Sequence, residues 1–152
     1  MGYYDLLKEA DETGIQVKEK PLLAHDGLIN GHRIAIRKDI PTLVQKTTVL
    51  AEELGHYHTS TGNILDQTNI SNRKQEHHAR LWAYDKLIGL SGIIKGFEAG
   101  CQSRYELAEH LNITEEFLQE AIDCYTAKYG ACVQIDGYVI MFTPGLGVMK
   151  RL

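Results

Sequence analysis

The sequence LAEELGHYHTSTGNILD, residues 50–66, carries the pattern that decides the fold of this chain. Leu50 and Leu54 lie four residues apart, a spacing that predicts the buried face of an amphipathic helix. Glu52 and His56 have the same spacing, so both side chains point the same way about one helical turn apart. Glu53 stands between them. The stretch therefore predicts a helix that presents two carboxylates and one imidazole close together.

This pattern is one residue away from a known metal motif. In the zincin motif H-E-x-x-H, two histidines four residues apart bind zinc and the glutamate acts as general base. Here the order is Glu-Glu-x-x-His, with Glu52 at the first ligand position, Glu53 at the base position and His56 at the second ligand position. A carboxylate oxygen binds zinc at about the same distance as an imidazole nitrogen. The exchange also favours harder ions such as manganese.

A catalytic metal usually has three protein ligands, so a third residue is required. The later stretch RKQEHHARLWAY, residues 73–84, offers Glu76, His77 and His78 at the start of a second helix expected over residues 72–90. Four of the seven histidines lie between residues 56 and 78. This clustering supports a metal site, but the residues alone leave the choice among the three candidates open.

The segments before the first helix predict a small sheet. The sequence GLINGHRIAIRKDI, residues 27–40, contains Asn30-Gly31, a dipeptide that type I′ turns favour, between alternating apolar and polar residues. It predicts an antiparallel β-hairpin, preceded by a helix over residues 3–12 and an extended segment over residues 14–23. Asp39 is the expected N-cap of the following helix, with Pro41 in its first turn and Leu43 on its buried face.

The second half predicts mainly helices. Residues 103–130 have the rhythm of two helices joined by a short turn, with Thr114 as a cap, and one or two short strands are expected around residues 138–142. Gly89, Gly92 and Gly96 are expected to loosen the chain between the halves without forming a linker. We therefore expect one domain over residues 1–152, with the metal-site core in 1–95 and the helical pair and C-terminal strand in 96–152.

Composition and charge exclude several classes of function. The net charge of −4 argues against general affinity for nucleic acids or anionic membranes. A helix-turn-helix DNA-binding regulator remains an alternative reading of the C-terminal helices. However, residues 98–123 contain seven acidic residues and one basic residue, Arg104, and this charge would repel phosphates. With no bilayer-length apolar run and three cysteines without metal-type spacing, the chain is expected to be cytoplasmic.

Taken together, these stretches resemble the ImmA/IrrE family of small metallopeptidases from bacterial integrative elements and prophages. The resemblance covers the hairpin, the helix with paired glutamates, the EHHARLWA helix and the ending GYVIMFTPGL. It implies an α+β, zincin-like fold, in which a small N-terminal antiparallel sheet packs on metal-bearing helices and a helical part follows. It also implies that Glu76, with Ala79, Trp82 and Ala83 behind it, is the third metal ligand.

The same resemblance implies a function. Zinc, or manganese or another divalent ion, would be held by Glu52, His56 and Glu76, and Glu53 would be the general base of peptide hydrolysis. The implied substrate is a repressor protein of a mobile genetic element, with no direct contact to nucleic acid or membrane. An alternative is a peptidase-fold module that binds protein without catalysis. Tyr57, His58 and Tyr84 are unranked candidates for the donor to the oxyanion.

Overall fold

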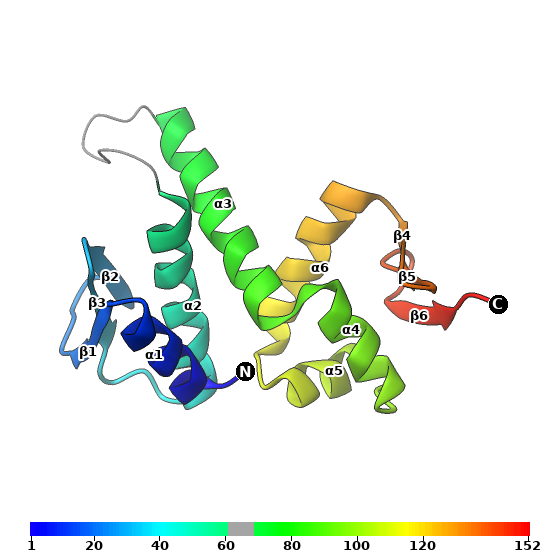
Figure 1. Ribbon diagram of the computed structural model, residues 1–152, viewed down its shortest axis with the longest axis horizontal. Helices are drawn as coiled ribbons and strands as arrows, with labels where there is room; N and C mark the ends of the chain where they lie inside the picture. Colours follow the sequence, from blue (N-terminus) through cyan, green and yellow to red (C-terminus); the bar gives the residue numbers. More distant parts are fainter. Residues whose placement is uncertain (61–68) are drawn as a thin grey trace. The chain divides into compact units, whose positions relative to one another are not determined.

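The computed structural model describes residues 1–60 and 69–152, and these divide into two compact units. The first unit is Met1–Ala83 and the second is Tyr84–Leu152, so the division falls within one long helix, α3 (Asn69–Leu87). Each unit is described by itself below (Figure 1). The fold is α+β, as expected. The organisation as one domain with a division near residue 95 stays a prediction.

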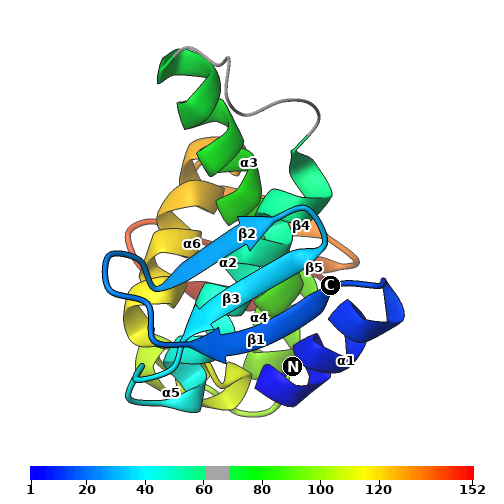
Figure 2. The ribbon, with the colours of Figure 1, turned by 90° about the vertical axis from the view of Figure 1, so that its left-hand side faces the viewer.

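The first unit combines a three-stranded sheet with helices. Before α3 its elements are, in chain order, α1 (Tyr3–Glu12), β1 (Gln16–Lys20), β2 (Gly27–Asn30), β3 (Arg33–Arg37) and α2 (Leu43–Thr59). The strand order is β1-β3-β2, which places β3 in the centre (Figure 2). Strands β2 and β3 are antiparallel, as expected for the hairpin, but β1 runs parallel to β3. The expectation of an antiparallel sheet is therefore wrong for β1.

The hairpin turn lies one residue later than expected. Asn30 pairs with Arg33, so the two central residues of the turn are Gly31 and His32. The positive φ of +60° falls on Gly31, the first central position, as in a type II′ turn, and Asn30 is not among the residues with positive φ. Glycine adopts this φ without the steric cost that a Cβ brings, which explains why the turn settles there.

Helix α2 packs under the sheet and forms the core of the first unit. Ile34 and Ile36 of β3 are 2% and 0% exposed, and Leu50 and Leu54 of α2 are 0% and 2% exposed. Figure 2 shows α2 behind the three strands. The predicted stripe is correct from Thr47 onward, which is 1% exposed. The buried residues that alternate along β3 thus face the buried residues that recur at helical spacing along α2.

The start of α2 differs from the expectation. The helix begins at Leu43, and the side chain of Thr42 caps it by accepting a hydrogen bond of 3.1 Å from the backbone N–H of Gln45. The predicted cap, Asp39, instead pairs with Arg37 at 3.0 Å. Leu43 is 47% exposed because it occupies the first turn, beyond the sheet, so its assignment to the buried face is wrong.

Helix α3 begins at Asn69, three residues before the predicted start. Its buried residues include Ala79, Ala83 and Leu87, which are spaced four residues apart. The sequence also predicts a loop over residues 59–71, but Thr59 ends α2 and Asn69 begins α3, and residues 61–68 lie outside the described residues. No helix in the described part of the chain is long and apolar enough to cross a membrane.

The second unit has more secondary structure than the sequence predicted. After the end of α3 its elements are α4 (Gly89–Glu98), α5 (Arg104–Leu111), α6 (Glu115–Tyr129), β4 (Cys132–Ile135), β5 (Tyr138–Met141) and β6 (Gly147–Lys150). Helix α4 replaces the loosened segment expected around the glycines. Gly96 faces α5 so closely that a Cβ there would lie 2.2 Å from Leu107 Cδ1. The glycine therefore permits helix packing instead of loosening the chain.

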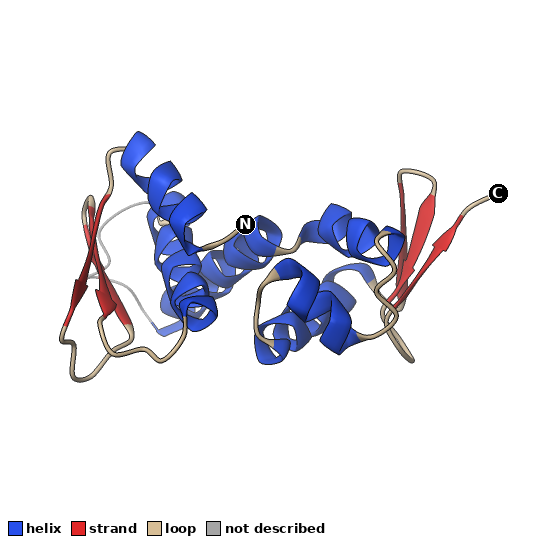
Figure 3. Cartoon of the chain, turned by 90° about the horizontal axis from the view of Figure 1, so that it is seen from below, coloured by secondary structure: helices blue, strands red, loops and turns tan. Residues whose placement is uncertain are grey.

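The C-terminal strands form an antiparallel sheet of order β4-β5-β6 (Figure 3). The sequence predicted one or two short strands around residues 138–142; β5 (Tyr138–Met141) confirms this prediction, whereas β4 and β6 lie outside the predicted range. The β4–β5 turn contains Asp136-Gly137, and both residues have positive φ, +49° and +79°. This is the type I′ pattern, and Asp-Gly is one of its favoured dipeptides. The signal was therefore present in the sequence and was missed.

The helical pair α5 and α6 is confirmed, and its apolar residues form a core. Ser103 and Thr114 cap the two helices through their side chains. Leu107, Phe117 and Leu118 are 0%, 2% and 0% exposed. These three residues are therefore part of the core.

Candidate metal centre

The base of the candidate site is the contact between β2 and α2. Gly27 lies in β2 directly over the helix, where a Cβ would come within 2.8 Å of Val49 Cγ1 and 2.9 Å of Glu53 Oε1. Only a residue without a side chain allows the strand to approach this closely. The carboxylate of Glu53 is thereby held beside the backbone of β2, at the edge of the sheet.

A second close contact fixes α3 against α2. A Cβ on Gly55 would lie 2.3 Å from the carbonyl oxygen of Ala79, which is far inside van der Waals contact. Ala79 itself is 0% exposed. Glu76 is three residues before Ala79 and therefore on the same side of α3, and His56 directly follows Gly55. The glycine–alanine contact thus brings the two functional side chains together.

His56 and Glu76 face each other across this helix pair. The distance from His56 Nε2 to Glu76 Oε1 is 3.4 Å. Two ligands of a tetrahedral zinc ion, each about 2.0–2.2 Å from the metal, are separated by about 3.3–3.5 Å. The pair therefore has the spacing of two metal ligands. The imidazole is 22% and the carboxylate 55% exposed, so the site is open to solvent.

The carboxylates around this pair repel one another. The pKa of Glu53 is raised from 4.5 to about 7, first by burial and then by the negative charges of Glu52 and Glu76. Burial is the largest cause of this shift, and the negative charges of the two neighbouring carboxylates add to it. The donor set of two or three carboxylates and one neutral imidazole therefore suits a divalent cation, whose charge would remove the repulsion.

The structure supports Glu52 as a metal ligand less directly than it supports His56 and Glu76. It lies on α2 one turn before His56 and is half-buried. Within residues 1–60 and 69–152, no three His, Cys, Asp or Glu side chains already surround a common point. Placing Glu52, His56 and Glu76 on the same ion would therefore require their side chains to come closer together. The chemistry of the residues fits a metal, and His56 and Glu76 supply its preformed half.

The other ligand candidates lie elsewhere on α3. His77 and His78 follow Glu76 directly, and both side chains are exposed. Their rings are 6.3 Å apart and tilted by 51°, so they contact each other. Of the three alternatives, only Glu76 has a short contact with His56. The structure thus favours the candidate that the family resemblance implied.

Aromatic side chains of α2 contact α3 and the hairpin turn. His58 of α2 stacks on Trp82 of α3, with ring centroids 4.8 Å apart and an angle of 17° between the planes. Trp82 of α3 therefore packs against α2. The Tyr57 hydroxyl and His32 Nδ1 are hydrogen-bonded at 3.1 Å, which ties α2 to the hairpin turn.

These contacts distinguish the three candidates for the oxyanion donor. Tyr84 is 5% exposed, and its hydroxyl donates to Glu120 within the second unit at 3.4 Å. Tyr84 therefore takes part in the packing of the second unit. Tyr57 is held by His32 and His58 is stacked on Trp82, so both remain in the first unit beside His56.

Sequence reasoning missed Gly27 and Gly55 as residues that build the site. Neither has a reactive side chain, and their role appears only when the neighbouring segments are in place. Gly55 did carry a signal, because a glycine inside a helical pattern costs stability and often marks close packing. Nothing in the sequence pattern indicated which segment would approach it.

Comparison with known proteins identifies the region that contains this centre. A family model described as "IrrE N-terminal-like domain" (Peptidase_M78) matches residues 10–123, three quarters of the chain. The match includes the hairpin, α2, α3 and most of the helices that follow. No curated protein and no solved structure matches the chain.

Proposed function

The chain belongs to the ImmA/IrrE family and carries its metallopeptidase-type domain, and on this basis we propose that it is a zinc-dependent endopeptidase. The observation that carries the proposal is the distance of 3.4 Å between His56 Nε2 and Glu76 Oε1, the separation of two ligands on one metal ion. Glu52 is the proposed third ligand and Glu53 the proposed general base.

In the proposed reaction a metal ion would contribute one chemical effect, and the residues of the chain would contribute the others. A zinc ion held by these residues would supply Lewis-acid chemistry at the scissile carbonyl and the attacking water. Two carboxylate ligands would formally neutralise a divalent ion, so it is a weaker acid than with histidine ligands. Manganese is for this reason an alternative ion.

Glu53 moves the proton in this proposal. Its carboxylate accepts a proton from the attacking water, whose oxygen adds to the carbonyl carbon, and passes it to the nitrogen as the C–N bond breaks. The pKa of Glu53 is raised to about 7, first by burial and then by the charges of Glu52 and Glu76, so its charged form is disfavoured. A bound divalent cation would lower this pKa, so that Glu53 is ionised and ready to accept the proton at neutral pH.

The substrate enters along the edge of the sheet in this proposal. Of the described strands, only β3 pairs with β2, which leaves the other edge of β2 for an extended peptide. Gly27 of β2 lies against Glu53 Oε1, so a peptide on this edge passes beside the base. The proposed substrate is a repressor of a mobile genetic element in the bacterial cytoplasm, as the family resemblance implies.

The test separates metal binding from hydrolysis. Zinc affinity is measured by competition with a fluorescent chelator for the wild type and for His56→Ala, Glu76→Gln and Glu53→Gln. His78→Ala is the matched control, because it removes an exposed histidine two residues from Glu76. Cleavage of the repressor encoded nearest to the gene for this chain is followed by mass spectrometry.

We expect His56→Ala and Glu76→Gln to lose zinc and cleavage together. Glu53→Gln keeps zinc and stays folded but loses cleavage, and His78→Ala retains both. Wild-type zinc affinity in His56→Ala would refute the metal centre. Zinc binding without cleavage of the repressor by the wild type would instead support the non-catalytic binding module.

A further inference from the structure

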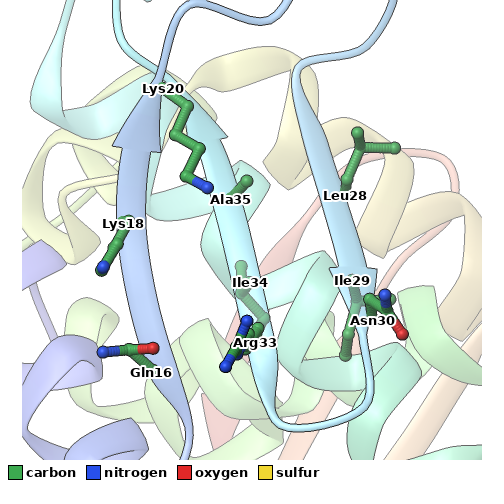
Figure 4. A pocket seen from close by; sticks show the side chains of 9 residues that line it. All are labelled: Gln16, Lys18, Lys20, Leu28, Ile29, Asn30, Arg33, Ile34 and Ala35. Atoms are coloured by element: carbon green, nitrogen blue, oxygen red, sulfur yellow. The ribbon is translucent and has the colours of Figure 1, made fainter.

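The face of the first sheet that points away from α2 is hollowed and carries positive charge. The hollow has a volume of about 520 Å³. Figure 4 shows side chains from all three strands around it. Its lining contains three cations and no carboxylate: Gln16, Lys18 and Lys20 of β1, Leu28, Ile29 and Asn30 of β2, and Arg33, Ile34 and Ala35 of β3. The whole chain has a net charge of −4, so the positive charge of this surface is opposite in sign to that of the chain.

The positive charges of the hollow have no ion-pair partner in the part of the chain that the structure describes. Among the residues that the structure describes, no carboxylate lies within ion-pair distance of Lys18, Lys20 or Arg33. Arg37, at the end of the same strand as Arg33, shows the contrast, because it pairs with Asp26 at 2.9 Å. The cations within the hollow are therefore available to an anionic ligand.

The spacing of these cations matches an extended polypeptide. Lys18 and Lys20 are two residues apart on β1, so their side chains leave the same face about 6.6–6.8 Å apart. Alternate side chains of an extended peptide have the same separation. Arg33 lies on the neighbouring strand, opposite Gln16. Acidic residues at alternate positions can thus meet successive cations of the sheet.

The floor of the hollow also suits a peptide. Ala35 sits in the central strand between Lys18 of β1 and Leu28 of β2. Leu28 is 45% exposed, although it is a large apolar residue. A small side chain flanked by an exposed leucine leaves room for an apolar side chain between the acidic ones. Gln16 and Asn30 offer amide groups at the rim.

We propose that this outer sheet face docks an acidic, extended segment of the protein substrate. The inference rests on the proposed function for its link to catalysis, because β2 contributes Leu28 to the hollow and Gly27 to the contact with Glu53. A substrate segment that pairs with β2 can continue onto the outer face. The substrate class is thereby narrowed to proteins with acidic residues near the cleaved bond.

Charge and shape favour a peptide over a nucleic acid. No aromatic residue is among the residues that line the hollow, so stacking of bases, which strengthens single-strand binding, has no platform there. The net charge of −4 also opposes a long phosphate backbone across the chain. A short acidic peptide would contact only the positively charged hollow and not the rest of the negatively charged chain.

Binding is tested on the full zinc-loaded chain with the Glu53→Gln substitution, which prevents cleavage. The probe is a short fluorescein-labelled peptide with glutamate at alternate positions, and its counterpart has glutamine instead. A triple variant, Lys18→Gln, Lys20→Gln and Arg33→Gln, removes the charges of the hollow. The matched control removes three exposed lysines elsewhere: Lys8, Lys95 and Lys150.

We expect the hollow variant to bind the acidic peptide roughly tenfold more weakly at about 0.05 M salt, and the difference to shrink at about 0.5 M. The control variant binds as the parent does, and the glutamine peptide binds weakly to all. Equal binding by both triple variants would overturn the proposal. Tighter, hollow-dependent binding of a single-stranded oligonucleotide would overturn the choice of a peptide.

Cleavage assays then separate this inference from the proposed function. In chains that retain Glu53, the hollow variant should raise the KM for an acidic substrate and leave kcat nearly unchanged. Cleavage with identical KM in both triple variants would refute docking while the peptidase proposal stands. Hollow-dependent binding without any cleavage would refute the peptidase proposal while docking stands.

Discussion

Replacing Gly55 with alanine is expected to open the candidate metal centre without touching a ligand. The added Cβ would lie 2.3 Å from the carbonyl oxygen of Ala79, and ordinary contact begins at 3.4 Å. The obstacle is backbone, so it cannot rotate away as a side chain can. The helices α2 and α3 must therefore separate by about 1.1 Å at this point, the difference between the two distances.

The same separation of α2 and α3 would move the two proposed metal ligands apart. His56 and Glu76 are carried by the same two helices, and their 3.4 Å separation leaves little tolerance for zinc ligation. We expect zinc affinity to fall about 10–100-fold, the range seen when residues that support metal ligands are changed. Overpacking costs about 1–3 kcal/mol of unfolding free energy, partly offset by about 1 kcal/mol from the better helix propensity of alanine.

Two other glycines in helices provide matched controls. A Cβ on Gly92 would meet Leu111 Cδ2 at an ordinary 3.6 Å, so Gly92→Ala is expected to stabilise the chain by up to about 1 kcal/mol. A Cβ on Gly96 would lie 2.2 Å from Leu107 Cδ1, so Gly96→Ala is expected to destabilise it. Both lie in the second unit and should leave zinc affinity unchanged.

The three variants are compared by urea unfolding and by zinc competition with a fluorescent chelator. Loss of zinc affinity confined to Gly55→Ala supports the close helix contact as the cause. If Gly55→Ala binds zinc as tightly as the wild type, the reasoning from helix separation is refuted. If Gly96→Ala loses zinc to the same degree, general destabilisation explains the result instead.

Three further changes test the energetics of the fold. In the presence of a chelator, Glu53→Gln should be more stable than the wild type at pH 8, by on the order of 1–3 kcal/mol after allowance for partial exposure. The pKa of Glu53 in the folded state, about 7, lies above its ordinary value of 4.5. The wild type therefore has its full stability below about pH 4.5 and loses it as pH rises through about 7. A stability difference between the two proteins that stays constant across this pH range in urea unfolding would contradict the assignment. Tyr125→Phe removes the hydroxyl that donates to Asp85 at 2.8 Å and should cost about 1–2 kcal/mol in the same assay, and an unchanged midpoint would show that this bond contributes nothing. Lys46→Met breaks the ion pair with Glu19, whose side chain is 37% exposed, and should cost less than about 1 kcal/mol in thermal unfolding, so a larger loss would mean that the pair is stronger than its exposure implies.

The elements that the sequence predicted well are those with a strong local pattern. The first helix, Tyr3–Glu12, has the predicted bounds, and the buried spacing of Leu50 and Leu54 is confirmed. The hairpin is present, with its turn one residue away at Gly31-His32. In each of these cases neighbouring residues in the sequence determine the structure.

The errors arise where another contact competes with the local preference of a residue. Asp39 has the side chain of an N-cap, but it pairs with Arg37, and Thr42 caps the helix. Gly96 looked like a flexible residue, but it packs against Leu107 within a helix. Local preference is a weak signal wherever a tertiary contact offers a larger gain in free energy.

The sequence by itself determined that Glu52, Glu53 and His56 lie within one turn of a helix, because helical geometry fixes neighbours three and four residues apart. It left the third ligand open among three adjacent residues. Only the tertiary structure places Glu76 within 3.4 Å of His56, through the contact of Gly55 with Ala79 that sets the distance between α2 and α3. That distance depends on which atoms of two separate helices meet, and spacing along one chain segment carries no information about it.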